Sequence, residues 1–573
     1  MGRRKKAQRA RKKKLLIALV IVVIVVIAAL AFLVKKYTPT SETVDLNTYY
    51  NIEEEQDIAL IIDREKNETL GKYINGEVYV PYDILQESIN ERFYWDSNEK
   101  ILLYTTANEV IKANANEAAY TAGKEVIQTS YQVVMIEEDE TYVALDFVEI
   151  YANVTHQAYE SPNRAVITSK WETITQATAK KETPIRVKGG IKSKIVDTLE
   201  KDEVVTIIEG GENWTKVMTE DGMIGYMKNS LMSDTKEVTL ANDFQEEEIS
   251  HNLKDEKVNL LWHQVTNQSA NNSISTVLAR SSGINVISPT WFYMNDENGG
   301  IASIASLDYV QTCHENDVEV WALVSNLENT DIDCEKVLTT TSLRTNLVNS
   351  IMAAAIQYGL DGINLDFESL STQGALGFVQ LIRELSIKCR ANDVILSVDN
   401  YVPSGYTTAY NRSEQAAFAD YVVIMAYDEH YAGSDEGSVS SINYVTESVT
   451  NTLKEVPAEQ IILGLPFYAR LWEETPDEDA ENGYTLSSTA VGMDEADTIL
   501  EENDANKTWN EELQQYYAEY EADGKTYKIW MEEETSLEAK LKIYQENNLA
   551  GAAFWKSGFE RSTIWDLVNK YVQ

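Results

Sequence analysis

The sequence predicts an α/β protein whose C-terminal part, residues 257–573, forms a (β/α)8 (TIM) barrel. Short apolar runs alternate there with amphipathic stretches such as "LRTNLVNSIMAAAIQYGL" and "GALGFVQLIRELSIKCR", and eight such strand candidates follow one another. Most of the runs are continuously apolar, as expected for parallel strands that are covered on both faces. Before this barrel the sequence predicts a transmembrane helix, an α+β repeat stalk and a small β-barrel.

Length and charge limit the classes of function. A chain of 573 residues is too long for one compact domain, and its net charge of −43 is unevenly distributed. Residues 1–36 hold 11 Lys and Arg and no acids, which leaves 38 basic against 92 acidic residues in the remainder. A body this acidic repels nucleic acid, so we expect no nucleic-acid partner.

The N-terminus carries a membrane signal. A basic cytoplasmic tail (1–14) precedes 20 uninterrupted apolar residues, 15–34, which as a helix span about 30 Å and suffice to cross a bilayer. The excess of Lys and Arg before this segment predicts a single-pass signal anchor with a cytoplasmic N-terminus and an extracellular body. The alternative is a cleaved signal peptide, because Ala29-Leu30-Ala31 resembles a cleavage site.

After a polar linker (35–50), residues 51–170 contain a weak internal repeat. The segments that begin "YVPYDILQES" at Tyr79 and "YVALDFVEIY" at Tyr142 lie 63 residues apart, and each predicts a strand, a short helix and a strand pair. The pair resembles the stalk modules of the copper amine oxidase N-terminal family. No copper chemistry is implied, because these modules lack the metal ligands.

Residues 173–235 change to short β-rich runs with Gly and Asp turns, which predicts a small β-barrel. The hairpins "GENWTKV" and "DGMIGYM" resemble the bacterial SH3 family, some of whose members bind cell-wall peptides. An acidic, polar linker (236–256) follows.

The fourth strand of the predicted barrel breaks the apolar rule. In "GINLDFE" the residues Asn364, Asp366 and Glu368 alternate with apolar ones, so one amide and two acids share a strand face. This pattern is consistent with a barrel strand if the polar face points into the C-terminal mouth, where such enzymes place their chemistry.

Four ordered motifs resemble glycoside hydrolase family 18, the chitinase family. They are "DGINLDFE" (361–368), similar to the D-x-x-D-x-D-x-E signature, followed by "IMAYDEH" (424–430), "GLPFYARLW" (464–472) and "AGAAFWKSGFE" (550–560). The similarity covers 257–573 and is greatest to bacterial peptidoglycan and spore cortex N-acetylglucosaminidases.

The resemblance implies catalytic roles. Glu368 is the expected acid; a free Glu has a pKa of about 4.3, so burial and a neighbouring anion, supplied by Asp366, must raise it. The family is an exception to two-carboxylate retention, because the 2-acetamido oxygen of the substrate attacks the sugar. Asp366 would orient that acetamido group, and Tyr427 would hydrogen-bond its carbonyl. Asn364 stands where the wider family has Asp; an amide can donate a hydrogen bond to Asp366 but cannot share a proton with it.

The remaining site residues are expected to bind the sugar. Trp555 would stack on the ring, Met425 and Asp428 would line the same pocket, and Tyr468, Arg470 and Trp291 would contact the substrate. Core packing is an equally good reading of Trp291. Residues 472–530 resemble the small insertion that follows strand seven in this family.

These inferences combine into one expectation. The chain is predicted to be a membrane-anchored extracellular glycosidase that cleaves β-1,4 bonds at N-acetylglucosamine in peptidoglycan or chitin-like polymers. The alternatives are a non-catalytic glycan-binding relative and a cell-wall docking protein. No metal or other cofactor is expected, and the three cysteines, which suit buried thiols better than a disulfide framework, form no zinc-type cluster.

Overall fold

The computed structural model describes residues 2–480 and 482–572 of the chain. Met1, Glu481 and Gln573 lie outside the described residues, so the basic tail (1–14), the insertion (472–530) and the barrel segment (257–573) are each described without one residue. The chain divides into two compact units, 1–93 with 113–120 and 127–246, and 94–112 with 121–126 and 247–573. Each unit is described by itself.

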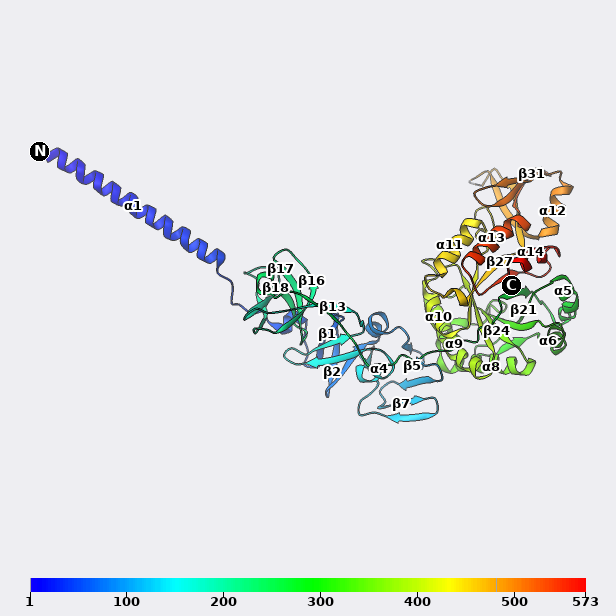
Figure 1. The fold of residues 1–573 in the computed structure, drawn as a ribbon, viewed down its shortest axis with the longest axis horizontal. Helices are drawn as coiled ribbons and strands as arrows, with labels where there is room; N and C mark the ends of the chain where they lie inside the picture. Colours follow the sequence, from blue (N-terminus) through cyan, green and yellow to red (C-terminus); the bar gives the residue numbers. More distant parts are fainter. Residues whose placement is uncertain (1, 481, 573) are drawn as a thin grey trace. The chain divides into compact units, whose positions relative to one another are not determined.

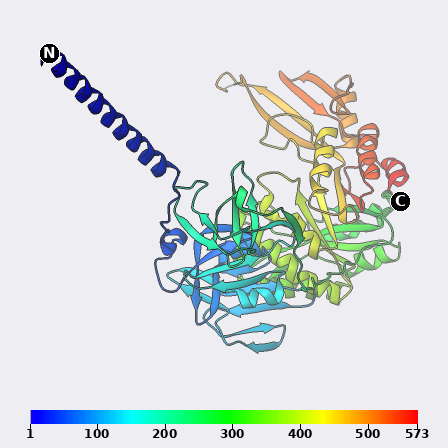
Figure 2. The ribbon, with the colours of Figure 1, turned by 60° about the vertical axis from the view of Figure 1, so that its left-hand side comes forward.

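The first unit begins with α1 (Gly2–Tyr37), a single continuous helix (Figure 2). It is long and apolar enough to cross a membrane, and none of its apolar stretch is buried against the rest of the protein. Side chains such as Leu15 and Phe32 are each 66% exposed, which is unfavourable in water and suits a lipid environment.

A seven-stranded sheet of order β11-β12-β1-β2-β3-β10-β9 follows. Its strands are β1 (Asp57–Ile62), β2 (Glu65–Ile74), β3 (Glu77–Pro81), β9 (Val134–Glu137), β10 (Glu140–Ala144), β11 (Thr155–Tyr159) and β12 (Arg164–Thr168). The two repeat segments start on β3 and β10, which pair antiparallel with Ala144 opposite Tyr79. Each is followed by a short helical segment, α3 (Tyr82–Ile84) continuing into η1 (Leu85–Ile89), and α4 (Leu145–Tyr151).

A second seven-stranded sheet completes this unit, with the order β15-β14-β18-β17-β16-β13-β19. The strands are β13 (Thr173–Thr178), β14 (Thr183–Arg186), β15 (Ile195–Leu199), β16 (Val204–Glu209), β17 (Trp214–Thr219), β18 (Ile224–Lys228) and β19 (Lys236–Thr239). Antiparallel hairpins such as β17–β18 enclose a small apolar core that includes Ile185, Val205, Val217 and Met227. The short β-rich runs of the sequence therefore form one compact antiparallel module.

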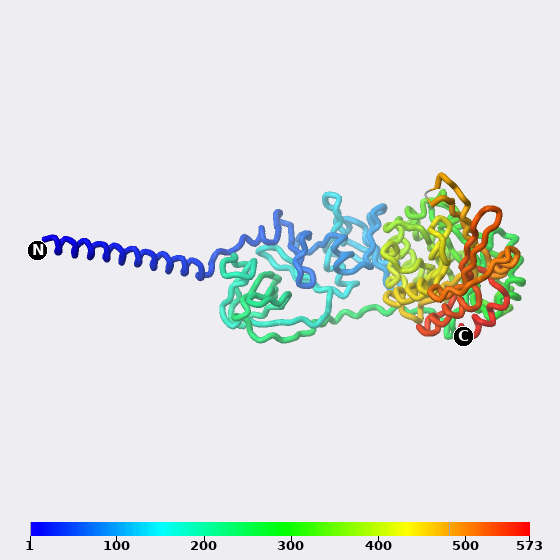
Figure 3. The backbone as a smooth tube through the Cα atoms, turned by 90° about the horizontal axis from the view of Figure 1, so that it is seen from above, coloured from blue at the N-terminus to red at the C-terminus, as the bar shows by residue number. Residues whose placement is uncertain are grey.

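The second unit contains the predicted barrel (Figure 1). Within the described residues, eight parallel strands close on themselves, because the first strand pairs with both the second and the last. They are β20 (Val258–His263), β21 (Val286–Met294), β23 (Glu319–Ser325), β24 (Gly362–Asp366), β25 (Ile395–Tyr401), β26 (Tyr421–Met425), β27 (Ile461–Pro466) and β33 (Gly551–Trp555). In Figure 3 the red C-terminal segment lies against the green start of the barrel, as this closure requires. The predicted fold class is confirmed.

Helices surround the strands. They are α5 (Ile274–Arg280), α6 (Leu307–His314), α7 (Cys334–Thr339), α8 (Thr341–Tyr358), α9 (Thr372–Ala391), α10 (Arg412–Phe418), α11 (Ile442–Thr452), α13 (Glu534–Glu546) and α14 (Ile564–Tyr571). A large apolar layer between helices and strands includes Ile363, Leu365 and Phe367, the apolar half of the "GINLDFE" alternation. The polar half therefore points to the barrel interior.

An insertion after the seventh strand forms a separate lobe (β31 and α12 in Figure 1). It comprises β28 (Tyr468–Pro476), β29 (Tyr484–Gly492), α12 (Met493–Glu502), β30 (Thr508–Asn510), β31 (Gln515–Ala522) and β32 (Lys525–Trp530), with the sheet order β29-β28-β32-β31-β30. The lobe begins at Tyr468, four residues before the expected start. The other domain boundaries stay predictions.

One stalk segment belongs to the second unit. Residues 94–112 contain β4 (Tyr94–Asp96), β5 (Ile101–Thr105) and the start of β6 (Val110–Asn114), and they pack on helices α8 and α9. Asp96, fully buried, accepts a hydrogen bond from the backbone N–H of Thr341 at 2.6 Å, and Gln380 donates to Thr105 at 3.1 Å. This part of the stalk is thus an integral layer of the second unit, which the sequence did not indicate.

Candidate active site

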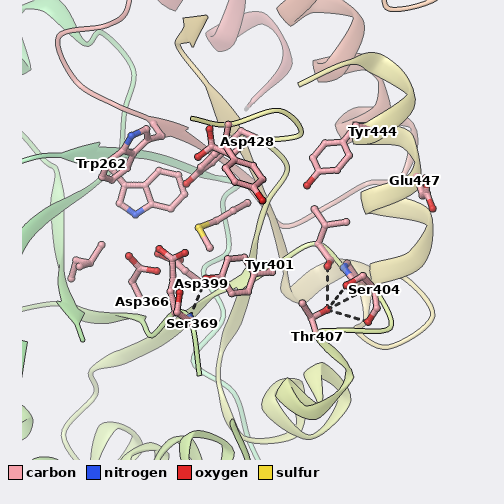
Figure 4. Close-up of a pocket in the computed structure, with 18 residues that line it drawn as sticks. Trp262, Asp366, Ser369, Asp399, Tyr401, Ser404, Thr407, Asp428, Tyr444 and Glu447 are labelled. Atoms are coloured by element: carbon pink, nitrogen blue, oxygen red, sulfur yellow. Dashed lines mark hydrogen bonds between the residues drawn. The ribbon is translucent and has the colours of Figure 1, made fainter. Parts of the chain in front are cut away.

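A pocket of about 910 Å³ opens at the C-terminal ends of the barrel strands. Asp366 is the last residue of β24, Met425 the last of β26 and Trp555 the last of β33, and all three line the pocket. Figure 4 shows Asp366 and Asp399 next to each other below Trp262, with Asp428 farther along and Tyr444 and Glu447 of helix α11 on the opposite wall. The strand ends therefore bring acids and aromatic rings together around one cavity.

Three carboxyls form the centre of the site, and we call Asp366, Glu368 and Asp399 the acid cluster. Asp366 and Glu368 come from the end of β24 and the loop after it, and Asp399 comes from β25. Neither Lys nor Arg is among the described residues that line the pocket. The acid cluster therefore lacks the cationic partner that buried carboxylates usually have.

Burial and mutual repulsion set the charge of these acids. Burial raises the pKa of Asp366 well above its ordinary value, and the charges of Asp399, Glu368 and Glu328 raise it further. Burial also raises the pKa of Asp399 to about 8, against the opposing effect of a hydrogen bond from Asn364. Oδ1 of Asp366 is buried without a hydrogen-bond partner, so its ionised form is poorly solvated.

The backbone of Glu368 is fixed by two hydrogen bonds to the side chain of Asn326. Its N–H donates to Oδ1 of Asn326 at 2.9 Å, and the amide nitrogen of Asn326 donates back to the Glu368 carbonyl at 2.9 Å. Burial raises the pKa of Glu368, a hydrogen bond from Tyr401 lowers it, and the charge of Asp428 raises it again. The expected upward shift is present, but the anion that contributes to it is Asp428 and not Asp366, because Asp366 itself holds its proton tightly.

Asn364 lies behind the pocket and is fully buried. Its Oδ1 accepts hydrogen bonds from Nε1 of Trp262 and Oγ of Ser288, both at 2.9 Å. Its Nδ2 donates to Oδ1 of Asp399 at 2.7 Å. The donation to Asp366 that an amide here could make is thus replaced by one to Asp399, since the two acceptor bonds orient the amide N–H group toward β25.

Aromatic rings shape one wall of the pocket. The ring centroid of Trp262 lies 6.0 Å from that of Trp555 and 6.4 Å from that of Tyr427, in edge-to-face contacts. Tyr427 and Trp555 both line the cavity. Burial raises the pKa of the Tyr427 phenol well above its usual value, so the hydroxyl stays protonated and can donate a hydrogen bond.

Tyr468 and Arg470, which were expected to contact the sugar, lie behind the pocket lining. The hydroxyl of Tyr468 donates to Oδ1 of Asp428 at 2.6 Å, and the guanidinium of Arg470 lies 3.6 Å from the same oxygen. Neither lines the pocket, and Tyr468 is only 4% exposed. They hold Asp428, whose φ of +55° is an unusual backbone conformation for an aspartate in this loop.

Trp291 is not brought to the site. It is fully buried in the layer between strands and helices, its Nε1 donates to Asn271 at 2.8 Å, and its ring packs edge-on against Tyr309. The register of β21 shifts between Thr290 and Phe292, at the position of this tryptophan. The expectation that Trp291 contacts the sugar is therefore wrong, and its alternative reading as a core residue fits the structure.

Several pocket residues were missed in the sequence. Trp262, Asp399, Tyr401 and Tyr444 line the cavity but were interpreted only as parts of strands or helices. The signal was present in "VDNY" (398–401), where Asp399 and Tyr401 interrupt an apolar strand with the same alternation as the fourth strand. Tyr444, on a helix with ordinary amphipathic spacing, had no such signal.

This fold and this acid-lined mouth define a barrel glycosidase. The chain belongs to the glycosyl hydrolases family 18, whose model matches residues 262–560. The other two resemblances are also confirmed, since a copper amine oxidase N-terminal domain matches 65–183 and a bacterial SH3 domain matches 181–233.

Curated relatives support a glycosidase. The uncharacterized glycosylase YvbX of Bacillus subtilis is 23% identical over 289 residues, which cover 48% of this chain and 81% of that protein. The cortical fragment-lytic enzyme of the same organism is 27% identical over 261 residues, 43% of this chain and 58% of that enzyme. The match thus spans less than two thirds of the cortical enzyme.

Solved structures agree on the fold. The spore cortex-lytic enzyme SleL of Bacillus cereus matches with a TM-score of 0.51 and 17% identity, over 59% of this chain and 77% of that one. At this identity the likeness shows a shared fold. The chain is a family 18 glycosidase related to cortex-lytic enzymes and chitinases.

Proposed function

We propose that this protein hydrolyses β-1,4 bonds next to N-acetylglucosamine in peptidoglycan or chitin-like polymers, with retention of configuration. The observation that carries the proposal is the position of Glu368, a carboxyl with a raised pKa at the mouth of an acid-lined barrel. Such a group holds its proton to higher pH than a free glutamate does and can give it to a glycosidic oxygen.

Glu368 acts as the general acid. Its backbone is fixed by two hydrogen bonds to Asn326, so the carboxyl has a defined origin from which to reach the leaving oxygen. After the leaving sugar departs, the same group accepts a proton from water and becomes the base for the second half-reaction. Because it must start protonated, activity falls as the pH rises through its raised pKa.

The substrate supplies the nucleophile. Its acetamido oxygen attacks the anomeric carbon, and the resulting oxazolinium ion carries a positive charge. Asp366 lies two residues before Glu368 and lines the same pocket, so it orients the acetamido N–H and balances this charge when ionised. The protonated hydroxyl of Tyr427 donates to the acetamido oxygen.

The walls favour an uncharged sugar. Trp555 offers a ring face for stacking, and Met425 and Asp428 line the adjacent part of the cavity. The described lining carries Asp366, Glu368, Asp399, Asp428 and Glu447 but neither Lys nor Arg. An acidic sugar would meet only like charge at this position, whereas N-acetylglucosamine is neutral.

Location supports a cell-wall substrate. We propose that α1 anchors the chain in the cell membrane as a single pass, with its basic end in the cytoplasm and the part of the chain after α1 outside. A tethered enzyme reaches the polymers next to the membrane, which favours peptidoglycan. Protease treatment of intact cells tests this topology; the prediction is that the C-terminal unit is digested while the segment before 15 is protected.

The activity is tested with the full chain in detergent. We expect it to release reducing ends from purified peptidoglycan or chitin, and Glu368→Gln to abolish release while leaving glycan binding intact. Glu335→Gln is the matched control, because Glu335 contacts Ser371 outside the pocket. Binding by the wild-type chain with no release from either polymer would show a glycan-binding protein instead.

A further inference from the structure

Asp399 is a buried carboxyl that the mechanism above does not use. It is 3% exposed, lies on β25 and lines the pocket. Neither Lys nor Arg lines the pocket around it among the described residues, and the groups that donate hydrogen bonds to it, the amide of Asn364 and the indole of Trp262, are neutral. An acid kept at this position without a cation is costly for the fold, which points to a role in the site.

The register places Asp399 beside Asp366. Strands β24 and β25 are parallel, with Asn364 opposite Ser397 and Leu365 opposite Val398, so the next pair in register is Asp366 and Asp399. Side chains opposite each other in parallel strands point to the same face. Figure 4 shows the two carboxyls as neighbours on the pocket floor.

The hydrogen bonds of Asn364 leave Asp399 as the acidic partner of Asp366. Its carbonyl oxygen is saturated by Trp262 and Ser288, so its N–H group points across to Asp399 and leaves Oδ1 of Asp366 without a partner. Position 364, which holds an acid in the wider family signature, thus holds a neutral amide of fixed orientation here. The acid that could exchange charge with Asp366 stands on the neighbouring strand.

We propose that Asp399 is a positioning residue that takes the place of the missing acid at position 364, and that the Asp366–Asp399 pair carries a single negative charge which moves onto Asp366 when the acetamido group reacts. This inference rests on the proposed function.

The proton count of the pair is conserved. Burial raises the pKa of both carboxyls, the charge of Asp399 raises that of Asp366 further, and the charge of Glu368 raises that of Asp399, so at most one of the pair is ionised near neutrality. In the form that reacts, the pair has lost one proton and the charge is on Asp399, where the Asn364 N–H stabilises it. As the oxazolinium ion forms, the O–H bond on Asp366 breaks and one forms on Asp399, so the pair keeps a charge of −1.

Other ionisable groups face the pair from the surrounding strands. Glu368 from the loop after β24 and Glu328 from the loop after β23 repel a charge on Asp366. Tyr427 follows β26, and its phenol is affected by both aspartates. All of these are acids or phenols, so they disfavour a second charge on the pair.

The test compares Asp399→Asn with the wild-type full chain in detergent, acting on a soluble N-acetylglucosamine oligosaccharide. The account expects kcat to fall at least about tenfold while KM changes less than about threefold. We also expect the acidic limb of the kcat/KM profile to move to higher pH, because the single ionisation of the pair must then occur on Asp366, whose buried Oδ1 has no hydrogen-bond partner among the described residues. A purely structural role would leave that limb in place.

Rescue sharpens the test. The double variant Asn364→Asp/Asp399→Asn moves the acid back to the motif strand, and kcat should recover toward the wild-type value. Asp420→Asn is the matched control: Asp420 is equally buried but accepts backbone N–H groups of Leu396 and Asn252 outside the pocket, so the profile should not move. Melting temperatures check that each variant is folded, and Asp399→Ser, with a smaller side chain, replaces Asp399→Asn if that variant does not fold.

An unchanged kcat and acidic limb in Asp399→Asn would overturn this inference, and so would a double variant no faster than the single one. Both results leave the wild-type enzyme active, so they differ from a failure of the proposed function, in which the wild type itself releases no reducing ends.

Discussion

Two groups of buried charge in the same barrel are built in opposite ways. On the helix side, Arg344 is fully buried and lies 2.9 Å from Glu384, and Arg383 pairs with Glu414 at 2.9 Å. Gln380 links these two pairs, which we call the arginine–glutamate cluster. In the pocket, the acid cluster of Asp366, Glu368 and Asp399 has no cation among the described lining residues.

The difference separates a structural role from a chemical one. Burial lowers the pKa of Arg344, but its electrostatic interactions with Glu384 and Tyr94 outweigh this effect. The pKa is therefore raised and the charged form is stabilised. In the acid cluster burial and repulsion act in the same direction and favour the neutral, protonated form. Paired charges thus support the fold, whereas unpaired acids hold transferable protons at a cost in stability.

The largest expected effect is on catalysis. Glu368→Gln should reduce kcat by about 1,000-fold or more, because the glutamine has no proton to donate to the leaving oxygen. Its melting temperature should equal or exceed that of the wild type, since an unpaired buried acid is removed. Reducing-end assays with thermal denaturation measure both, and a destabilised but active variant would contradict the comparison.

The opposite result is expected from the arginine–glutamate cluster. Arg344→Met leaves Glu384 buried without its cation and should cost about 3–5 kcal/mol in the free energy of unfolding. The pH profile of the remaining activity should keep its shape, because Arg344 lies outside the pocket. Denaturant titration measures the stability, and rate measurements give the pH profile. A shifted pH profile at unchanged stability would show that the arginine–glutamate cluster affects the chemistry in the way expected of the acid cluster.

The pH dependence of stability sharpens the contrast. The folded pKa of Asp399, about 8, lies above the ordinary 3.8, so the folded state binds this proton more tightly than the unfolded state. Its stabilisation is complete below about pH 4 and is lost as the pH rises toward 8.

Asp399→Asn should therefore be more stable than the wild type by roughly 1–3 kcal/mol at pH 8, with a smaller gain at pH 5. Unfolding titrations at the two pH values measure this. A gain that is equal at both, or larger at pH 5, would show that Asp399 is not protonated by folding.

The smallest effect is expected where the stalk segment meets helix α8. Asp96→Ala removes the buried acceptor of the Thr341 N–H and should cost roughly 1–2 kcal/mol, while Asp96→Asn, which keeps one acceptor oxygen, should cost less. Thermal denaturation of the full chain compares them. Equal stability of both variants and the wild type would show that 94–112 adds nothing to the catalytic unit.

The sequence predicted the features that follow from the spacing of apolar and polar residues. The eight strands, the helices between them and the inward face of "GINLDFE" followed from alternation and from ordered motifs, and the structure has them. Glu368, Asp366, Tyr427, Trp555, Met425 and Asp428 were expected together and line one pocket.

The other features of the site and fold depend on side-chain contacts, which the spacing of apolar and polar residues does not reveal. Trp291 was expected to follow the second strand as a pocket residue would, but it lies within β21, where the register shifts, and packs in the core. The orientation of the Asn364 amide depends on Trp262 and Ser288, which are distant in sequence. The docking of 94–112 on the barrel joins segments more than 200 residues apart, and only the folded chain shows it.

The central claim is that burial and the nearby charge of Asp428 raise the pKa of Glu368, so that it holds its proton to higher pH than a free glutamate does. Infrared difference spectra between the wild type and Glu368→Gln, recorded across pH, measure this directly through the carbonyl band of the protonated carboxyl. Because burial raises the pKa of Glu368, we expect the band to persist above the ordinary glutamate pKa of about 4.3. A band that disappears at or below pH 4.3 would contradict the account.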